Sequence, residues 1–455
     1  MARRPRLEPR ETRLDATGAF LGTAAALARE YAAEEPPPRR IRTFSEAAPD
    51  DLRVALSILS RIRDLGLVVH GPAGCATRPA GALAALAVTD LDEQDTVLGS
   101  GDVLAETLRR LDATARPAAL AVLGSPVVAI NNDDIRATVA ELTQELGKPV
   151  VWVRTDGFRS AIAATGADAA ADALLQVADP GEAPRDPGLL NLLTTTRGPG
   201  IEALVAAIEA LGWRVNRLPD AARVADLRRA ATAAASLVLE PDTLDPLAEG
   251  LERRFGVVRL GLGVPVGPGA TTALLRRLAA LADVPAPAPA AFPFPAIGAL
   301  EGRRIAIALA PAWALAVADL VEELGGEVVL LSVPHLDRSH AAALHAFAER
   351  RPSVQLHVGD AQGFETAGLL RRVAPDAVLG LADTVAQALR QGLPAAVAVH
   401  DRLIGPAAAD YLLRLVEDAT EGSALAGHAA RASGARYSAA WLRRSPDWHI
   451  KQEVR

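Results

Sequence analysis

The 455-residue sequence predicts an α/β protein built from three doubly wound, Rossmann-like units in tandem. Short apolar runs alternate with amphipathic stretches along most of the chain, as in parallel strands joined by crossover helices. Two stretches rich in proline, 180–188 and 284–296, interrupt this alternation and favour linkers. The length agrees with this division, because a domain typically has ~150 residues.

The expected order starts with a helical extension over 1–40, whose helical pattern at 14–33 ends before three prolines. The first unit (41–185) has predicted strands at 66–69, 118–123 and 149–153 and predicted helices at 102–111 and 134–146. The second (186–290) has predicted strands at 189–193, 213–218, 236–240 and 257–263 and a helix at 270–282. The third (297–420) has predicted strands at 304–309, 327–331, 354–358, 377–381 and 395–399, and a tail follows over 421–455. Sheets of this kind bind ligands outside the carboxyl ends of their strands.

Composition excludes several classes of protein. A formal net charge of -7 argues against a nucleic-acid surface, which needs concentrated positive charge. No apolar run reaches the ~18 residues of a membrane span, so no membrane association is expected. The basic start is interrupted by Glu8 and has no apolar core behind it, which does not match a secretory signal. We therefore expect a cytoplasmic protein.

Cys75 is the only cysteine, so it cannot form an intramolecular disulfide, and the chain alone cannot supply four thiolates to an iron–sulfur cluster. It lies in the segment His70-Gly71-Pro72-Ala73-Gly74-Cys75, after a predicted strand and before a predicted helix. Glycines allow the backbone to approach a bulky ligand, and a helix N-terminus favours a thiolate. The alternative is an unreactive cysteine in an ordinary βα turn.

The order of several segments resembles the component 1 subunits of the nitrogenase family over about residues 40–420. The segments that carry the resemblance are 70–75, 92–101, 122–126, 132–135, 155–158, 302–309, 359–365 and 392–402. The resemblance implies three Rossmann-like domains of the nitrogenase component 1 type. It also implies a cofactor-binding site at Gly71, Gly74, Cys75 and Ser125, with Cys75 as the metal ligand.

This sequence departs from the family pattern at two of the three cluster cysteines. The first position falls near residues 42–45, which contain no thiol, and the third is Ser125, an alcohol that binds iron poorly. The resemblance is therefore to one-cysteine subunits, such as the Z subunit of chlorophyllide reductase and the N subunit of the cofactor-assembly scaffold. In these, one cysteine completes a 4Fe–4S cluster with three cysteines of a sister chain.

The resemblance implies an oxidoreductase subunit in a heterotetramer. Its partners would be a homologous sister subunit and an ATP-dependent iron–sulfur reductase that delivers electrons. Two alternatives stay open: a scaffold subunit for metallocofactor assembly, and a metal-free structural partner subunit.

Other candidates are weaker. His335, His340 and His345 recur at a spacing of five, which does not place ligands on one helical face, so we expect solvated or capping side chains. His449 is expected either to pack on a partner subunit or to lie exposed in the tail. The glycine-rich stretch 261–267 lacks the spacing of a nicotinamide site.

Overall fold

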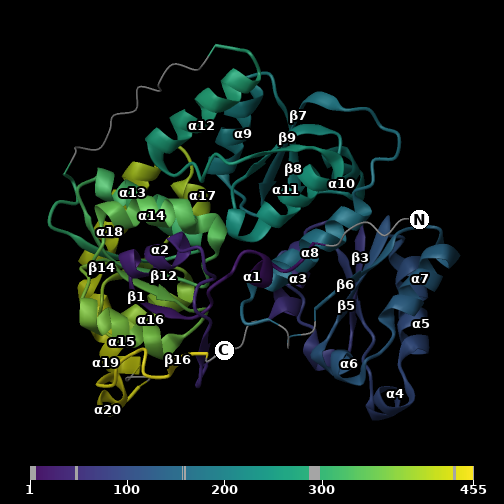
Figure 1. The fold of residues 1–455 in the computed structure, drawn as a ribbon, viewed down its shortest axis with the longest axis horizontal. Helices are drawn as coiled ribbons and strands as arrows, with labels where there is room; N and C mark the ends of the chain where they lie inside the picture. The colour runs from purple at the N-terminus through teal and green to yellow at the C-terminus, as the bar shows by residue number, and fades with distance from the viewer. Residues whose placement is uncertain are drawn as a thin grey trace. The chain divides into compact units, whose positions relative to one another are not determined.

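The structure is a computed structural model that describes residues 7–46, 50–155, 157, 160–285, 298–433 and 437–453. The chain divides into two compact units, each assembled from segments that are separate in the sequence (Figure 1). The first unit comprises Met1–Arg10, Pro49–Thr195 and Gly212–Leu262, and the second comprises Glu11–Ala48, Thr196–Leu211 and Gly263–Arg455. Each unit is described by itself below.

The first unit contains two parallel sheets. In the first sheet the strand order is β4-β3-β5-β6, with β3 (Leu65–His70), β4 (Ala85–Val88), β5 (Ala119–Gly124) and β6 (Val150–Val153). Its helices are α3 (Asp51–Leu59), the 3-10 helix η1 (Ala73–Cys75), α4 (Glu93–Leu98), α5 (Gly101–Ala115), α6 (Pro126–Asn131), α7 (Ile135–Leu146) and α8 (Ala164–Val177). Every residue of β3 and β5 is buried, which explains why both strands are continuous apolar runs.

The second sheet of this unit has the order β10-β9-β7-β8 and is also parallel. Its elements are β7 (Asp186–Thr194), β8 (Arg214–Pro219), α10 (Val224–Ala230), β9 (Ala233–Val238), α11 (Pro241–Phe255) and β10 (Val258–Leu260). One apolar core continues from Leu123 of the first sheet to Leu193 of the second. Helix α8 contacts both α3 and α11. Gly166 of α8 permits the close approach to α3, because a Cβ there would lie 2.3 Å from the carbonyl oxygen of Asp51.

The second unit contains the third sheet, whose order is β1-β13-β12-β11-β14-β15. Its strands are β1 (Phe20–Thr23), β11 (Arg304–Ala308), β12 (Glu327–Val333), β13 (Gln355–Val358), β14 (Ala377–Gly380) and β15 (Ala395–Val397). Its longer helices are α2 (Ala24–Ala32), α9 (Pro199–Glu209), α12 (Gly267–Leu281), α13 (Pro311–Glu323), α14 (Ala341–Arg350), α15 (Gly363–Val373), α16 (Ala382–Arg390), α18 (Ala408–Glu421) and α19 (Ser423–Ser433). The short elements are η2 (Arg338–His340), α17 (His400–Leu403) and α20 (Ala439–Leu442). All strand pairs are parallel except β1 with β13.

The predicted N-terminal helix is partly wrong. Instead of one helix over 14–33, the structure has the edge strand β1, with Phe20 buried, and then α2, which Thr23 caps. The helix begins at Ala24 because the backbone of residues 20–23 pairs with β13. A short helix, α1 (Arg10–Arg13), lies at the division between the two units. Further along, β2 (Arg40–Arg42) pairs antiparallel with β16 (Ile450–Gln452), near the end of the chain.

Three mainly parallel sheets with crossover helices confirm the predicted fold class. The proline-rich boundary predicted at 284–296 lies mostly in residues 286–297, which are outside the described residues, and the predicted domain limits stay predictions. No helix in the described part has both the length and the apolar character needed to cross a bilayer.

Candidate functional site

The predicted cluster segment follows β3 at the carboxyl end of the first sheet. The backbone turns at Gly71, and a Cβ on Gly71 would lie 2.1 Å from Oγ of Ser125. Only glycine fits at this position, because no side-chain atom tolerates so short a contact. The structure therefore brings together two of the four predicted site residues, one from each of two neighbouring strand ends.

Cys75 lies at the end of the short turn η1 and is half-buried. Its backbone N–H donates to the carbonyl of Pro72 at 3.0 Å, and the N–H of Ala73 donates to Oδ1 of Asp90 at 3.0 Å. A Cβ on Gly74 would meet nothing within 4 Å, so there is open space beside the thiol turn. These hydrogen bonds thus hold the turn in place, while the space beside Gly74 is open.

The helix that the sequence predicted after Cys75 is absent. Residues 76–84 contain no helix, and the next regular element is β4. Pro79 and Gly81, which has a φ of 72°, interrupt the chain there. Cys75 is therefore not followed by a helix N-terminus that could favour its thiolate, contrary to the prediction.

His70 is buried, with 1% of its surface exposed, and both ring nitrogens have hydroxyl partners. Nδ1 lies 3.2 Å from Oγ1 of Thr89, and Nε2 lies 3.0 Å from Oγ of Ser100. The Ser100 hydroxyl also donates to Asp133. Burial lowers the pKa of His70 to about 4, against the opposing attraction of Asp133. The imidazole is therefore neutral at physiological pH, where it orders the turn from the inside.

Ser125 follows β5 and precedes α6. It is fully buried, and its N–H donates to the carbonyl of His70 at 2.9 Å. Its hydroxyl has no hydrogen-bond partner in the described part of the chain. A buried hydroxyl without a partner is costly, so its presence beside the glycine turn is the most unusual polar feature of this site.

The described residues do not form a complete metal site at Cys75. Among the described residues there is no group of three or more His, Cys, Asp or Glu side chains placed to hold a metal ion. The residues present supply one thiolate beside open space, which fits one corner of an iron–sulfur cluster and no more.

A second candidate feature lies in the other unit, at the carboxyl end of the third sheet. Here the chain leaves β11 and β14 in opposite directions, which is where doubly wound sheets bind ligands. A crevice of about 580 Å³ opens there, beside the first residues of α13, α15 and α16. Polar side chains that line it are Glu46, Ser332, Asp360, Gln362, Thr366, Asp383, Thr384, Gln387 and Arg390.

Most of these crevice residues were not predicted as site residues from the sequence. Ser332 directly follows the predicted strand 327–331, and Asp383 and Thr384 follow the predicted strand 377–381 closely. Their position just beyond apolar runs was the available signal, since parallel strands end at one edge of a sheet.

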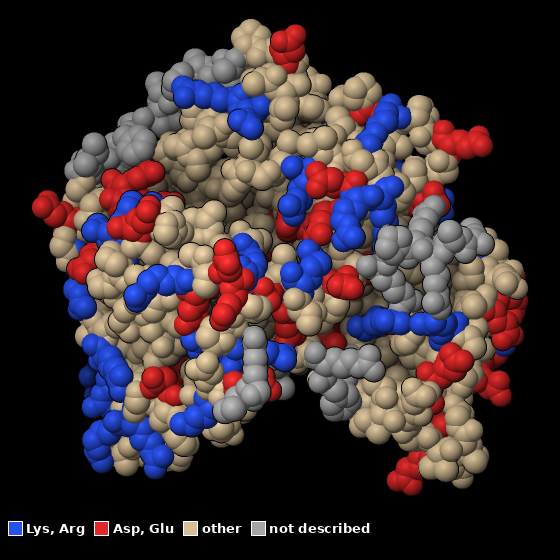
Figure 2. All heavy atoms as spheres, in the orientation of Figure 1, with Lys and Arg blue, Asp and Glu red and all other residues tan. Residues whose placement is uncertain are grey.

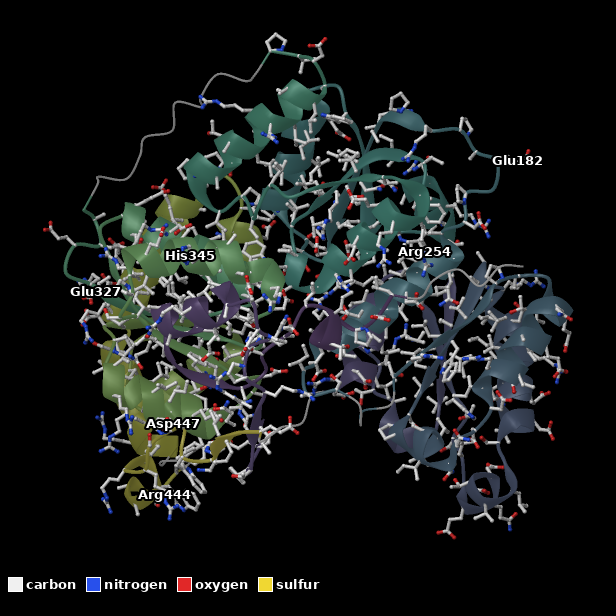
Figure 3. The ribbon with its side chains drawn as sticks, viewed as in Figure 1. Glu182, Arg254, Glu327, His345, Arg444 and Asp447 are labelled. Carbon is white, nitrogen blue, oxygen red and sulfur yellow. The ribbon has the colours of Figure 1, made fainter. Side chains whose placement is uncertain are left out.

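The structure also gives the exposure and the contacts of the other candidate histidines. His345, labelled in Figure 3, is 60% exposed on α14 and lies 3.3 Å from Glu349, as expected of a solvated residue. His340 completes a cap with Asp337. His335 differs from the prediction because it is 6% exposed and packs edge-on against His340. His449 is also buried within this chain, so the predicted exposed tail position is wrong for it.

The chain is similar to known proteins in sequence and in fold. The profile of the family described as nitrogenase component 1 type oxidoreductase matches residues 52–420. Two similar proteins are light-independent protochlorophyllide reductase subunits B. That of Rhodospirillum rubrum is 35% identical over 208 residues, which cover 43% of this chain and 37% of the relative. That of Synechococcus is 32% identical over 181 residues, 38% of this chain and 33% of the relative. These matches thus span about a third of each relative's length.

Solved structures of nitrogenase Cp1 share the fold. The structure at pH 6.5 has a TM-score of 0.68 and 16% identity, covering 84% of this chain and 94% of that chain. The structure at pH 5 has a TM-score of 0.67 and 16% identity, covering 95% and 96%. At this identity the likeness concerns the fold alone.

Proposed function

Because this chain belongs to the nitrogenase component 1 type oxidoreductase family, we propose that it is the one-cysteine subunit of a nitrogenase-like reductase. In this proposal it pairs with a homologous sister subunit and shares a 4Fe–4S cluster through Cys75. The observation that carries the proposal is a single half-exposed thiol in a glycine turn with open space beside it.

Ligand counting supports a sister chain that differs from this one. A homodimer would offer two thiolates, whereas a 4Fe–4S cluster is ordinarily held by four. A sister chain with three cysteines would complete the set with Cys75. The space beside Gly74 is where such a cluster would lie against this chain.

Residues of this chain would hold in place the turn that carries the thiol of Cys75. Asp90 holds the turn through the N–H of Ala73, and Thr89 accepts from the N–H of Gly71 at 2.9 Å. The buried neutral imidazole of His70 adds no positive charge next to the thiol turn. A bound cluster would supply one-electron redox chemistry, whose potential depends on burial and on such hydrogen bonds.

An apolar surface on the same unit supports docking of a further protein, proposed here to be an ATP-dependent iron–sulfur reductase. Val97 and Leu98 on α4 are 82% and 84% exposed, and Ile130 on α6 is 70% exposed. The side-chain amide of Asn131 donates to the carbonyl of Thr96 at 3.2 Å, so the two helices are joined. Exposed apolar groups of this size are a common mark of a protein interface.

The names of the curated relatives favour a reductase over the scaffold alternative. Both are subunits of light-independent protochlorophyllide reductase, so a tetrapyrrole is the first substrate class to test. The crevice at the carboxyl end of the third sheet is the place in the second unit where we propose substrate contacts.

The test is anaerobic co-purification of this chain with its homologous sister subunit, followed by iron analysis and electron paramagnetic resonance. We expect about four irons per pair and a reducible signal, both lost in Cys75→Ala. Thr77→Ala, exposed two residues further on, is the matched control and should keep both. A pair without iron would refute the shared cluster, and a Cys75→Ala complex with full activity would favour a metal-free structural subunit.

A further inference from the structure

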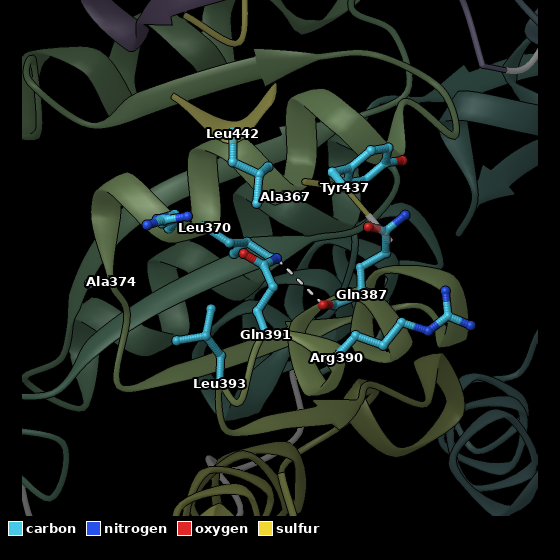
Figure 4. A pocket seen from close by; sticks show the side chains of 10 residues that line it. Ala367, Leu370, Ala374, Gln387, Arg390, Gln391, Leu393, Tyr437 and Leu442 are labelled. Carbon is cyan, nitrogen blue, oxygen red and sulfur yellow. Dashed lines mark hydrogen bonds between the residues drawn. The ribbon is translucent and has the colours of Figure 1, made fainter. Parts of the chain in front are cut away.

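A further pocket of the second unit adjoins the crevice of the third sheet, where the C-terminal segment packs on α15 and α16. It has a volume of about 330 Å³ and lies between α15, α16 and residues 437–442 (Figure 4). We call it the tail pocket. Tyr437 and Leu442 lie across it from Gln391 and Leu393. A pocket of this size holds a small ligand rather than a protein segment.

The walls of the tail pocket are held in place without a ligand. The Tyr437 hydroxyl donates to Oε2 of Glu46 at 2.5 Å, and its ring packs edge-on against Phe364 at 5.7 Å. The guanidinium of Arg444 lies 4.9 Å and 5.1 Å from the ring centres of Trp441 and Trp448. Such cation–π contacts fix an otherwise exposed segment, so the pocket is preformed.

The lining combines an apolar floor with cations. Leu370, Leu393 and Leu442 contribute aliphatic surface. Arg371 and Arg390 are exposed at the rim, and neither has an ion-pair partner in the described part of the chain. None of the described residues that line the pocket is acidic. An apolar body with one anionic group therefore matches this lining.

The surrounding surface strengthens the same preference. Basic side chains gather over the surface formed by α15, α19 and α20 (Figure 2). The exposed arginines there are Arg371 and Arg372 on α15, Arg431 on α19, and Arg443 and Arg444, which directly follow α20. A local excess of positive charge raises the concentration of small anions at the pocket mouth, although the whole chain has a net charge of -7.

We propose that the tail pocket binds a small monocarboxylate with an aliphatic body. The hydrocarbon chain would pack on the three leucines, and the carboxylate would accept hydrogen bonds from Arg371 at the rim. Arg390 and Gln387 line the crevice of the third sheet as well, so an occupant of the tail pocket would touch residues that both cavities share. This proposal is independent of any cluster at Cys75.

The experiment is calorimetric titration of the full chain with octanoate, with octylamine and octanol as probes of the same length. We expect saturable binding of octanoate and much weaker binding of the amine and the alcohol. Arg371→Gln should weaken octanoate binding about tenfold, the size expected for one lost hydrogen bond to a charged group. Arg372→Gln, on the same helix but outside the lining, is the matched control and should bind like the parent protein.

A second variant separates charge from folding. Gln391→Glu places an anion in the pocket and should reverse the preference, so that octylamine binds more tightly than octanoate. Thermal unfolding of each variant verifies that the fold is retained. The proposal is wrong if octanoate binding does not saturate, if octylamine binds the parent as tightly, or if the two arginine variants weaken binding equally.

Discussion

Nε2 of His449, in the C-terminal segment, lies 2.8 Å from Oε1 of Glu365 on α15. The same carboxylate accepts hydrogen bonds from Nε of Arg42 at 2.6 Å and pairs with Nε2 of His357 at 2.7 Å. Glu365 is 1% exposed. One buried carboxylate thus connects β2, β13 and the end of the chain, three segments far apart in the sequence.

Stability in acid should depend on this carboxylate. Burial would raise the pKa of Glu365, but hydrogen bonds from His357 and Arg42 outweigh it and lower the pKa from 4.5 to about 2. The folded chain therefore binds fewer protons at this site than the unfolded chain. The stabilising contribution is complete above pH 4.5 and is lost as the pH falls towards about 2.

Glu365→Gln should lower the free energy of unfolding by about 3 kcal/mol at neutral pH, because it leaves Arg42 buried without an anion. The difference in unfolding free energy between this variant and the parent protein should shrink as the pH falls from 4.5 towards about 2. Urea unfolding followed by circular dichroism at several pH values measures it. Glu349→Gln, at an exposed position, is the control and should show a small, constant difference. A Glu365→Gln deficit that stays constant down to about pH 2 would contradict the assigned role.

A ladder of polar side chains crosses the second sheet and should specify its register. Asn191 on β7 is the Cα partner of Asn216 on β8 and of Ser236 on β9. Nδ2 of Asn216 donates to Oδ1 of Asn191 at 3.0 Å, and Nδ2 of Asn191 donates to Oγ of Ser236 at 3.2 Å. All three are buried.

Asn191→Leu should therefore destabilise the protein although it adds apolar surface. It removes one of the two acceptors of the Asn216 side-chain amide, and we expect a loss of about 2 kcal/mol in the free energy of unfolding. Denaturant unfolding followed by tryptophan fluorescence, to which Trp152 and Trp213 of the first unit contribute, measures this loss. Gln144→Leu, at an exposed position of α7, is the control and should change stability by less than about 0.5 kcal/mol. Equal stability of Asn191→Leu and the parent would show that the ladder contributes nothing.

The strands were predictable wherever burial on both faces makes them continuous apolar runs, as in β3, β5, β11 and β14. Strand β4 was missed because its four residues, Ala85–Val88, are half-buried and rich in alanine. Strand β1 was absorbed into a helical pattern because its pairing with β13 depends on residues more than 300 positions away. Local periodicity carries no information on such a partner.

The candidate site was predictable only in part for the same reason. The glycines and Cys75 form a local pattern, but the contact of Gly71 with Ser125 requires the ends of two neighbouring strands. The pairing of Arg42 with Glu365, across 323 positions, could not be seen in a single sequence. Arg42 lies near the position where the family resemblance would place the first cluster cysteine. In the structure its contact with Glu365 anchors β2.

The contact between Gly71 and Ser125 allows a test that distinguishes steric fit from backbone flexibility. A Cβ on residue 71 would lie 2.1 Å from Oγ of Ser125, 2.6 Å from its Cβ and 3.9 Å from its Cα. Gly71→Ala should therefore cost about 1–3 kcal/mol of unfolding free energy, as expected for overpacking. Removing only the hydroxyl with Ser125→Ala still leaves the 2.6 Å contact and should not rescue it, whereas Ser125→Gly should.

A double-mutant cycle by denaturant unfolding measures this coupling. We expect a stabilising interaction of at least about 1 kcal/mol between Gly71→Ala and Ser125→Gly, and almost none between Gly71→Ala and Ser125→Ala. Additive effects in both pairs would mean that the loss in Gly71→Ala comes from the backbone at residue 71 and not from Ser125. If the coupling is found, the two strand ends that flank the thiol turn are packed to contact distance within this chain. A bound cluster would then have to lie on the open side, beside Gly74 and Cys75.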